Sequence, residues 1–166
     1  MLFIIIYLSS IILCEIGVRI LFETIVYDKA KYHYEGDFPQ ELPMEQAFVH
    51  TGMFLGWIID NHLFSDEFLE ETEEEINKFK LRKMTGTQVY MFWDGVLSDD
   101  MLNDEGNQFA IDYFDFEKGL YLDDYDDVFL ECDTLYQVQD TWGNYFKLKE
   151  VIDTRYKEWK KLKSNG

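Results

Sequence analysis

A long apolar stretch in the first half of the chain is the feature that most constrains its fold. Nine of the thirteen residues from Ala47 to Ile59 are apolar, so a helix over 44–63 would be hydrophobic on nearly every side. Such a helix belongs at the centre of a folded domain. Gly52 and Gly56 form a G-x-x-x-G pattern within it, which lowers helix propensity and predicts that another backbone passes close to this face.

The segments around this helix also carry helical signals. Ser65 is a good N-cap for a surface helix over 66–82, and Asp140 is expected to cap a last helix that ends in several lysines. The segment 33–43 contains both prolines and is expected to be extended or turn-like. We predict further helices over 87–93, 98–119 and 120–129, and a brief strand over 135–138. The fold class is therefore expected to be all-α, a compact bundle of about five or six helices preceded by an apolar N-terminal helix.

The N-terminal segment is set apart by its composition. Residues 2–22 are almost uninterrupted in apolar character, and as a helix of about 1.5 Å per residue they would just cross a hydrocarbon core of about 30 Å. Glu15, Arg19 and Glu23 would lie on one stripe of that helix and could pair with one another. We therefore divide the chain into residues 1–26, a candidate membrane anchor, and residues 27–163, an acidic helical domain.

Three interpretations of the segment 2–22 remain open. It can be a membrane anchor, a helix packed on the domain, or upstream sequence that a different start codon would omit. For an anchor, basic residues follow the apolar run and none precedes it, so the positive-inside bias places the domain in the cytoplasm, tethered to the inner membrane by a single helix. Without an anchor, we expect a cytoplasmic protein.

Net charge restricts the class of partner. The chain has 15 Lys and Arg against 33 Asp and Glu, a formal net charge of −18. Because such a surface repels phosphate, we expect no nucleic-acid binding and favour basic proteins or metal cations. Cys14 and Cys132 are too few for a disulfide framework, which suits a reducing compartment.

Four sequence stretches resemble a family of small acidic bacterial proteins of unknown function. They are YDKAKYHYEGDFP, HTGMFLGWIIDNHL, DGVLSDDMLNDEGNQFAIDYF and DTWGNYFKLKEVIDTRY. The resemblance covers about residues 27–159, and the apolar N-terminal segment lies outside it. It implies a bacterial origin and a single compact domain, and it transfers no activity or site residues.

One acidic stretch is a candidate metal site, and the histidines are not. Residues 94–107 are rich in oxygen ligands for Ca²⁺ or Mg²⁺. The candidate ligands are Asp94, Asp99, Asp100 and Glu105. His50 and His62 are twelve residues apart on the expected helix, about 18 Å in rise, so a zinc site formed by all three histidines is excluded. We interpret His33, His50 and His62 individually as hydrogen-bonded residues at the edge of the core.

A second acidic run predicts a surface that binds a partner. Its aspartates are interleaved with tyrosines that could grip Lys or Arg side chains of a basic protein. The candidate residues are Tyr121, Asp123, Asp124, Tyr125, Asp126 and Asp127.

No nucleotide, protease, hydrolase or redox motif occurs. We therefore expect no resident cofactor beyond a divalent cation, and favour a non-enzymatic module that binds a basic partner, as an immunity protein binds its toxin. The alternatives are a metal-dependent hydrolase that uses the carboxylates of 94–105, and a membrane-tethered cytoplasmic scaffold.

Overall fold

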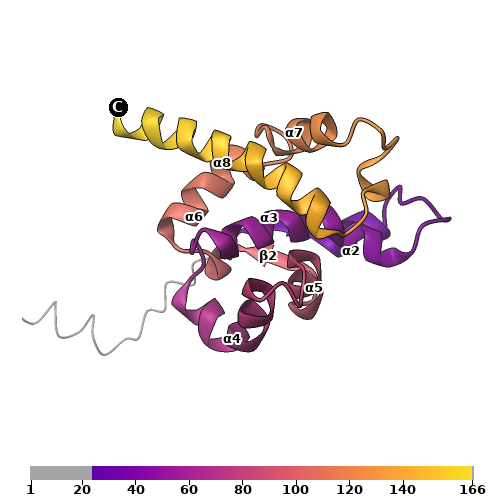
Figure 1. The fold of residues 1–166 in the computed structure, drawn as a ribbon, viewed down its shortest axis with the longest axis horizontal. Coiled ribbons are helices and arrows are strands. Elements are labelled where there is room, and N and C mark those ends of the chain that lie inside the picture. The colour runs from indigo at the N-terminus through magenta and orange to yellow at the C-terminus, as the bar shows by residue number, and fades with distance from the viewer. Residues whose placement is uncertain (1–23, 166) are drawn as a thin grey trace, which may run out of the picture.

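The computed structural model describes residues 24–165, and these form a mostly helical domain with one small sheet (Figure 1). Seven α-helices are described, and in chain order they are α2 (Ala30–Tyr34), α3 (Val49–Asp60), α4 (Asp66–Lys80), α5 (Gly86–Phe92), α6 (Asp104–Phe109), α7 (Tyr121–Val128) and α8 (Trp142–Ser164). Short 3-10 turns are η1 (Met44–Phe48), η2 (Asp99–Met101) and η4 (Leu135–Gln137), and η3 (Ala110–Phe114) is a π-helix that continues α6. The expected N-terminal apolar helix over residues 2–22 lies outside the described residues. Within residues 24–165, every helix is too short or too polar to cross a membrane.

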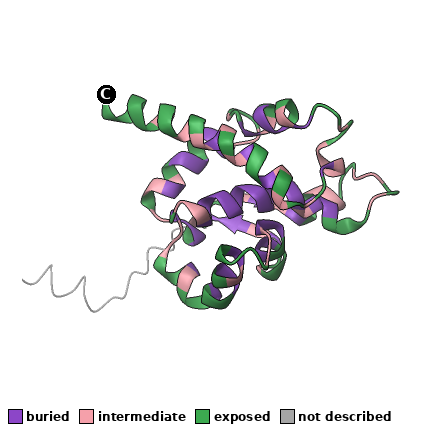
Figure 2. Ribbon diagram, viewed as in Figure 1, coloured by how far each residue is buried: buried purple, intermediate pink, exposed green. Residues whose placement is uncertain are grey.

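Helix α3 is the centre of the domain, as its composition predicts. Every residue from Val49 to Ile59 is buried, and α3 is the most continuously buried ribbon in Figure 2. Helix α8 crosses on one side, while α4 and α5 lie on the other (Figure 1). The prediction of a central helix is confirmed, although its first turn, η1, has 3-10 geometry.

The close backbone approach predicted from the glycines of α3 is also present. A Cβ atom on Gly52 would lie 2.3 Å from the Cα of Thr87 at the start of α5, and one on Gly86 would lie 2.2 Å from the Gly52 carbonyl oxygen. These distances are too short for any side chain, so glycine is required on both helices. Backbone therefore packs directly on backbone where α5 begins.

The sheet was not predicted. Strand β1 (Val26–Lys29) pairs antiparallel with β2 (Val96–Ser98), with Asp28 opposite Leu97. Because the inward residue of this short strand is an aspartate, the alternation of apolar and polar residues that identifies strands is missing. Strand β1 leads directly into α2, so His33 is helical, which corrects the expected turn at that position.

Other element boundaries differ from the predictions for local reasons. The helix over 98–119 begins only at Asp104, because the Asn103 side chain accepts from the Gly106 N–H at 2.9 Å and Ser98 ends β2. Thr141 caps α8 in place of Asp140, whose carboxylate accepts hydrogen bonds from Thr85 and Thr87. The expected strand over 135–138 contains the 3-10 turn η4. Ser65 caps α4 as predicted, accepting from the Phe68 N–H.

Candidate metal centre

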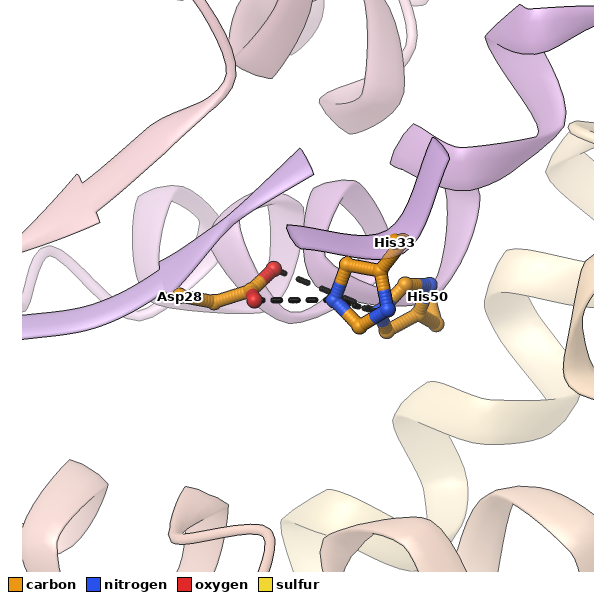
Figure 3. A group of neighbouring side chains, drawn as sticks. All are labelled: Asp28, His33 and His50. Atoms are coloured by element: carbon orange, nitrogen blue, oxygen red, sulfur yellow. Dashed lines mark hydrogen bonds and ion pairs between the residues drawn. The ribbon is translucent and has the colours of Figure 1, made fainter. Parts of the chain in front are cut away.

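Three ligand-type side chains from three elements converge beside the N-terminal end of α3. Asp28 is on β1, His33 on α2 and His50 in the first turn of α3 (Figure 3). The Nε2 atom of His33 lies 2.8 Å from Oδ1 of Asp28 and 3.2 Å from Nε2 of His50, and the His50 Nε2 lies 4.0 Å from Oδ2 of Asp28. Within residues 24–165, this is the one group of at least three His, Cys, Asp or Glu side chains close enough to share an ion.

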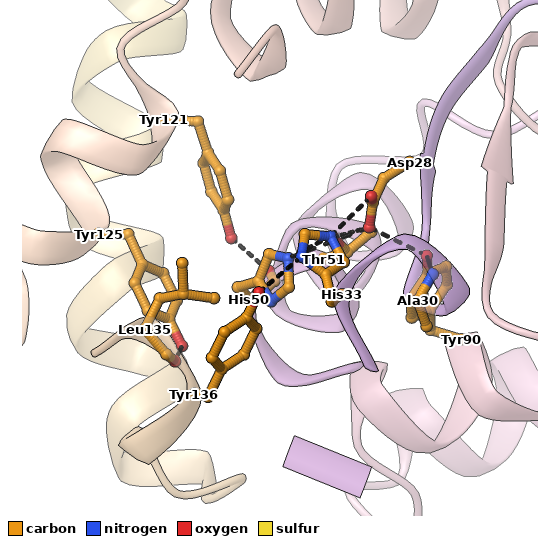
Figure 4. Close-up of polar contacts among 10 residues, drawn as sticks. All are labelled: Asp28, Ala30, His33, His50, Thr51, Tyr90, Tyr121, Tyr125, Leu135 and Tyr136. Atoms are coloured by element: carbon orange, nitrogen blue, oxygen red, sulfur yellow. Dashed lines mark hydrogen bonds and ion pairs between the residues drawn. The ribbon is translucent and has the colours of Figure 1, made fainter. Parts of the chain in front are cut away.

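Asp28 is held in one orientation by hydroxyl groups on its other oxygen. The Oδ2 atom accepts from the Thr51 hydroxyl at 2.6 Å and from the Tyr90 hydroxyl at 3.1 Å, and the Tyr90 oxygen accepts from the Ala30 N–H (Figure 4). Burial opposes ionisation of Asp28, but the hydrogen bond from His33, the proximity of the two histidines and the Thr51 hydroxyl outweigh it and lower its pKa. Asp28 is therefore an ionised carboxylate whose Oδ1 points at His33.

His50 is buried and neutral. Its side chain has no exposed surface, and burial together with the neighbouring His33 lowers its pKa to about 3. Within the described residues its Nδ1 atom has no hydrogen-bond partner, a cost that buried polar atoms seldom bear. Its Nε2 faces His33 and Asp28, so this imidazole is directed into the cluster.

In a neutral His33, a single Nε2 proton has to serve both contacts of this nitrogen, with Asp28 and with His50. A neutral His33 that donates its Nε2 proton to Asp28 has no Nε2 lone pair to accept a proton from His50. If His33 accepts from His50 instead, its lone pair faces an ionised carboxylate at 2.8 Å. A cation bound by the two imidazole nitrogens and the carboxylate would relieve this demand on the proton. Ligand atoms around tetrahedral zinc lie about 3.3 Å apart, because each is about 2.0–2.2 Å from the metal. The His33 Nε2 contacts of 2.8 and 3.2 Å are slightly shorter, and the distance from His50 Nε2 to the other carboxylate oxygen, Oδ2, is longer at 4.0 Å.

Aromatic rings surround the two imidazoles. The ring centroids of Phe116 and Tyr136 lie 5.8–6.1 Å from those of His33 and His50, and Tyr125 lies 6.5 Å from His50. The Tyr121 hydroxyl donates to the His50 carbonyl oxygen (Figure 4). The His33 side chain retains 15% exposure, so the cluster meets solvent at His33.

A family model described as a domain of unknown function (DUF7832) matches residues 26–138. The chain belongs to this family. This confirms the resemblance to a family of unknown function, while a bacterial origin stays a prediction. The comparisons with curated proteins and with solved structures found no match. Asp28, His33 and His50 all lie within the part of the chain that matches DUF7832.

The carboxylates predicted as a metal site are dispersed in the DUF7832 domain, each with its own surroundings. Asp99 accepts from the Ile25 N–H, Asp100 accepts from the Ser98 hydroxyl, and Glu105 contacts Lys160 and Tyr156. Asp94 lies exposed in a turn with φ of 54°. Three of these four carboxylates therefore have hydrogen-bond partners of their own. Within the described residues, the four carboxylates do not form a group close enough to share an ion.

The predicted partner-binding run lies on α7 and divides between interior and surface. Tyr121, Tyr125 and Asp124 are buried, and the Asp124 carboxylate pairs with Arg155 of α8. These three side chains face the core because α7 packs on α8 through that side, so they are not available to a partner. Asp123, Asp126 and Asp127 are exposed.

Sequence reasoning excluded a zinc site made from all three histidines, and it missed the cluster that two of them form with Asp28. His62 is exposed and follows the end of α3 in a left-handed conformation with φ of 57°. The missed ligand was Asp28, which reaches His33 through the junction of β1 and α2. One signal was available: His50 and Thr51 interrupt an otherwise apolar run, and buried polar residues need partners.

Proposed function

We propose that this domain binds one transition-metal cation through Asp28, His33 and His50. The observation that carries the proposal is the convergence of two imidazole nitrogens and the Asp28 carboxylate, with contacts of 2.8–4.0 Å between them. Imidazole ligands suit Zn²⁺, Co²⁺, Ni²⁺ and Cu²⁺, whereas Mg²⁺ and Ca²⁺ prefer sites made of oxygen. Zn²⁺ is therefore the first ion to test.

The ion would join elements that are separate in the sequence. Asp28 and His33 belong to the N-terminal arm formed by β1 and α2, and His50 belongs to the central helix α3. Coordination would fasten this arm to the core. Three protein ligands also leave one position of a tetrahedral zinc ion for water or another small group.

The test is a titration of the chelator-stripped full chain with Zn²⁺ in competition with a chromophoric chelator. We expect one equivalent to bind, and Co²⁺ to give a visible absorption spectrum typical of mixed nitrogen and oxygen ligands. Asp28→Asn and His33→Gln should abolish tight binding, with folding of each variant verified by circular dichroism. His62→Asn is the matched control, because Asn tolerates the left-handed backbone at that exposed position. Binding that survives both cluster substitutions would refute the proposal.

A second candidate function is binding of a basic protein by the exposed face of α7, as an immunity protein engages a cationic toxin. Partial burial and the neighbouring charges of Asp123 and Asp127 raise the pKa of Asp126, so these aspartates repel one another. A cationic partner would relieve that repulsion. The net charge of −18 adds long-range attraction.

A polylysine peptide is a suitable probe for this second function. Replacing Asp123, Asp126 and Asp127 with Asn should weaken its binding, and added salt should weaken binding to the unmodified chain. The control replaces Glu70, Glu71 and Glu74 of α4 with Gln, which removes the same charge from another surface. An equal loss in both triple variants would indicate general charge attraction and would eliminate α7 as a specific site.

A further inference from the structure

Tyr136 lies against the cluster of Asp28, His33 and His50 and is not one of the proposed metal ligands. It is part of η4, and its hydroxyl oxygen lies 3.0 Å from Nδ1 of His33, the ring nitrogen directed away from Asp28 (Figure 4). The ring also packs edge-on against Phe38, with centroids 4.9 Å apart. The buried Gln46 side chain fixes the η4 backbone, donating to the carbonyl oxygens of Tyr136 at 2.7 Å and Val138 at 3.1 Å. The tyrosine is therefore held in place from both its ring and its backbone.

The ring nitrogen of His33 that carries the proton differs between the metal-free and the metal-bound states. Without metal, the contact between Nε2 and Asp28 at 2.8 Å requires a proton on Nε2, so in a neutral imidazole Nδ1 is an acceptor. With metal on Nε2, the proton must be on Nδ1, which is then a donor. A hydroxyl can both donate and accept, so the Tyr136 hydroxyl can satisfy Nδ1 in either state.

Resting on the proposed metal binding, we infer that Tyr136 is the positioning residue for His33 and that its hydroxyl changes from donor to acceptor when the ion binds. The Nε2–H bond breaks and its proton leaves to solvent, the metal–Nε2 bond forms, and Nδ1 takes up a proton from solvent, which reaches His33 at its exposed edge. A neutral imidazole therefore carries one proton before and after. The Tyr136 hydroxyl proton then needs an acceptor other than His33, and Tyr136 is only partly buried. Tyr136 thereby keeps the His33 ring in the orientation that ligation needs.

Tyr136→Phe tests this role, because it keeps the ring against Phe38 and removes only the hydroxyl. Loss of a group that orients a metal-binding histidine typically lowers metal affinity by about 10–100-fold, and we expect a Zn²⁺ affinity reduced by that factor. Tyr156→Phe is the matched control, since it removes a hydroxyl that bonds to Glu105, away from the cluster. It should leave Zn²⁺ affinity unchanged.

A second measurement follows the proton directly, first in the unmodified chain. Long-range ¹H–¹⁵N spectra of the chain labelled on histidine nitrogens distinguish a protonated from an unprotonated ring nitrogen. We expect the His33 proton on Nε2 in the metal-free chain and on Nδ1 in the Zn²⁺-loaded chain. In metal-free Tyr136→Phe, the Nδ1 resonance should move to the position of a nitrogen without a hydrogen-bond donor.

The outcomes separate this inference from the function on which it rests. Zn²⁺ binding that depends on Asp28 and His33 but is unaffected by Tyr136→Phe, or that leaves the His33 proton on Nε2, would overturn the role of Tyr136 and leave the metal site standing. A chain that binds no Zn²⁺ would overturn both.

Discussion

Two buried aspartates, Asp28 and Asp124, are almost equally inaccessible but are satisfied in different ways. Asp124, 5% exposed, accepts from two nitrogens of Arg155 at 2.8 and 2.9 Å and from the Tyr113 hydroxyl at 3.0 Å. Asp28, 3% exposed, has two hydroxyl donors and a histidine, and it has no Lys or Arg partner within the described residues. Its nearest nitrogens belong to the imidazoles of His33 and His50.

This difference indicates which of the two regions is structurally complete. Around α8, a permanent cation is supplied by the chain itself, so Asp124 needs nothing further. Around α3, the permanent anion faces groups that are also metal ligands. A buried anion without a fixed cation is a stronger indication of an external ion than a surface cluster of carboxylates, which water can solvate.

The largest expected effect comes from removing the cation beside Asp124. Arg155→Ala should lower the free energy of unfolding by about 3 kcal/mol, the low end for a broken buried pair, because Arg155 is itself partly exposed. Urea unfolding measures this loss. The double variant Asp124→Asn/Arg155→Ala leaves no charge uncompensated and should recover part of it. A double variant as unstable as the single one would show that packing of Arg155, and not charge, is what matters.

Zinc should supply to Asp28 what Arg155 supplies to Asp124. At a free Zn²⁺ concentration about 100 times its dissociation constant, the free energy of unfolding should rise by about 2.7 kcal/mol. Thermal unfolding with and without Zn²⁺ measures the gain. His33→Gln should eliminate it, whereas Arg155→Lys, on the other side of the comparison, should retain it. A gain of equal size in His33→Gln would place the zinc elsewhere.

Acid should destabilise the folded chain through His50, the buried histidine beside Asp28. Because the pKa of His50 is lowered to about 3 in the folded chain, the unfolded chain takes up a proton below about pH 6.5 that the folded chain excludes. The contribution of neutral His50 to the free energy of unfolding is therefore complete above pH 6.5 and is lost as the pH falls. The linkage gives a decrease of about 2 kcal/mol between pH 7 and pH 5 in metal-free protein. Urea unfolding at both pH values tests this, and His50→Leu should reduce the slope.

The smallest effect concerns a single hydroxyl on Asp28. Thr51→Val removes the donor at 2.6 Å and leaves Oδ2 with the weaker bond from Tyr90, so the free energy of unfolding should fall by about 1–2 kcal/mol. Thr154→Val provides the comparison, because the Thr154 hydroxyl bonds to a carbonyl oxygen on an exposed helical face. Equal effects of the two substitutions would mean that Asp28 does not depend on Thr51.

The main features of the fold follow from local sequence signals. The apolar run around Phe54, the glycines of α3 and the Ser65 cap determine the central helix, its close neighbour and the start of α4, and all three were predictable. The β1–β2 pair was not, because two strands of three and four residues pair across about 70 positions and β1 directs an aspartate inward. Local periodicity carries no information about such a contact.

The candidate site was harder to predict for the same reason. The sequence predicts a turn at His33 and a place at the core edge for His50, and it gives no signal at Asp28, because nothing in the spacing of these residues places them together. The acidic stretch of 94–105 is predicted as a metal site only because it contains many carboxylates. Density of carboxylates in sequence says little about convergence in space, since each can be satisfied by its own neighbours.

The contact between Gly52 and Thr87 has a consequence for ion selectivity. His50 and Thr51 directly precede the point where the two helix backbones touch, so this turn of α3 can neither slide nor rotate. The side of the cluster that His50 forms is therefore constrained, and adjustment to a larger or smaller ion would fall on Asp28 of β1 and on His33, which belongs to a five-residue helix next to solvent. If the domain binds an ion as we propose, the choice among divalent ions would depend on how far the arm formed by β1 and α2 can shift.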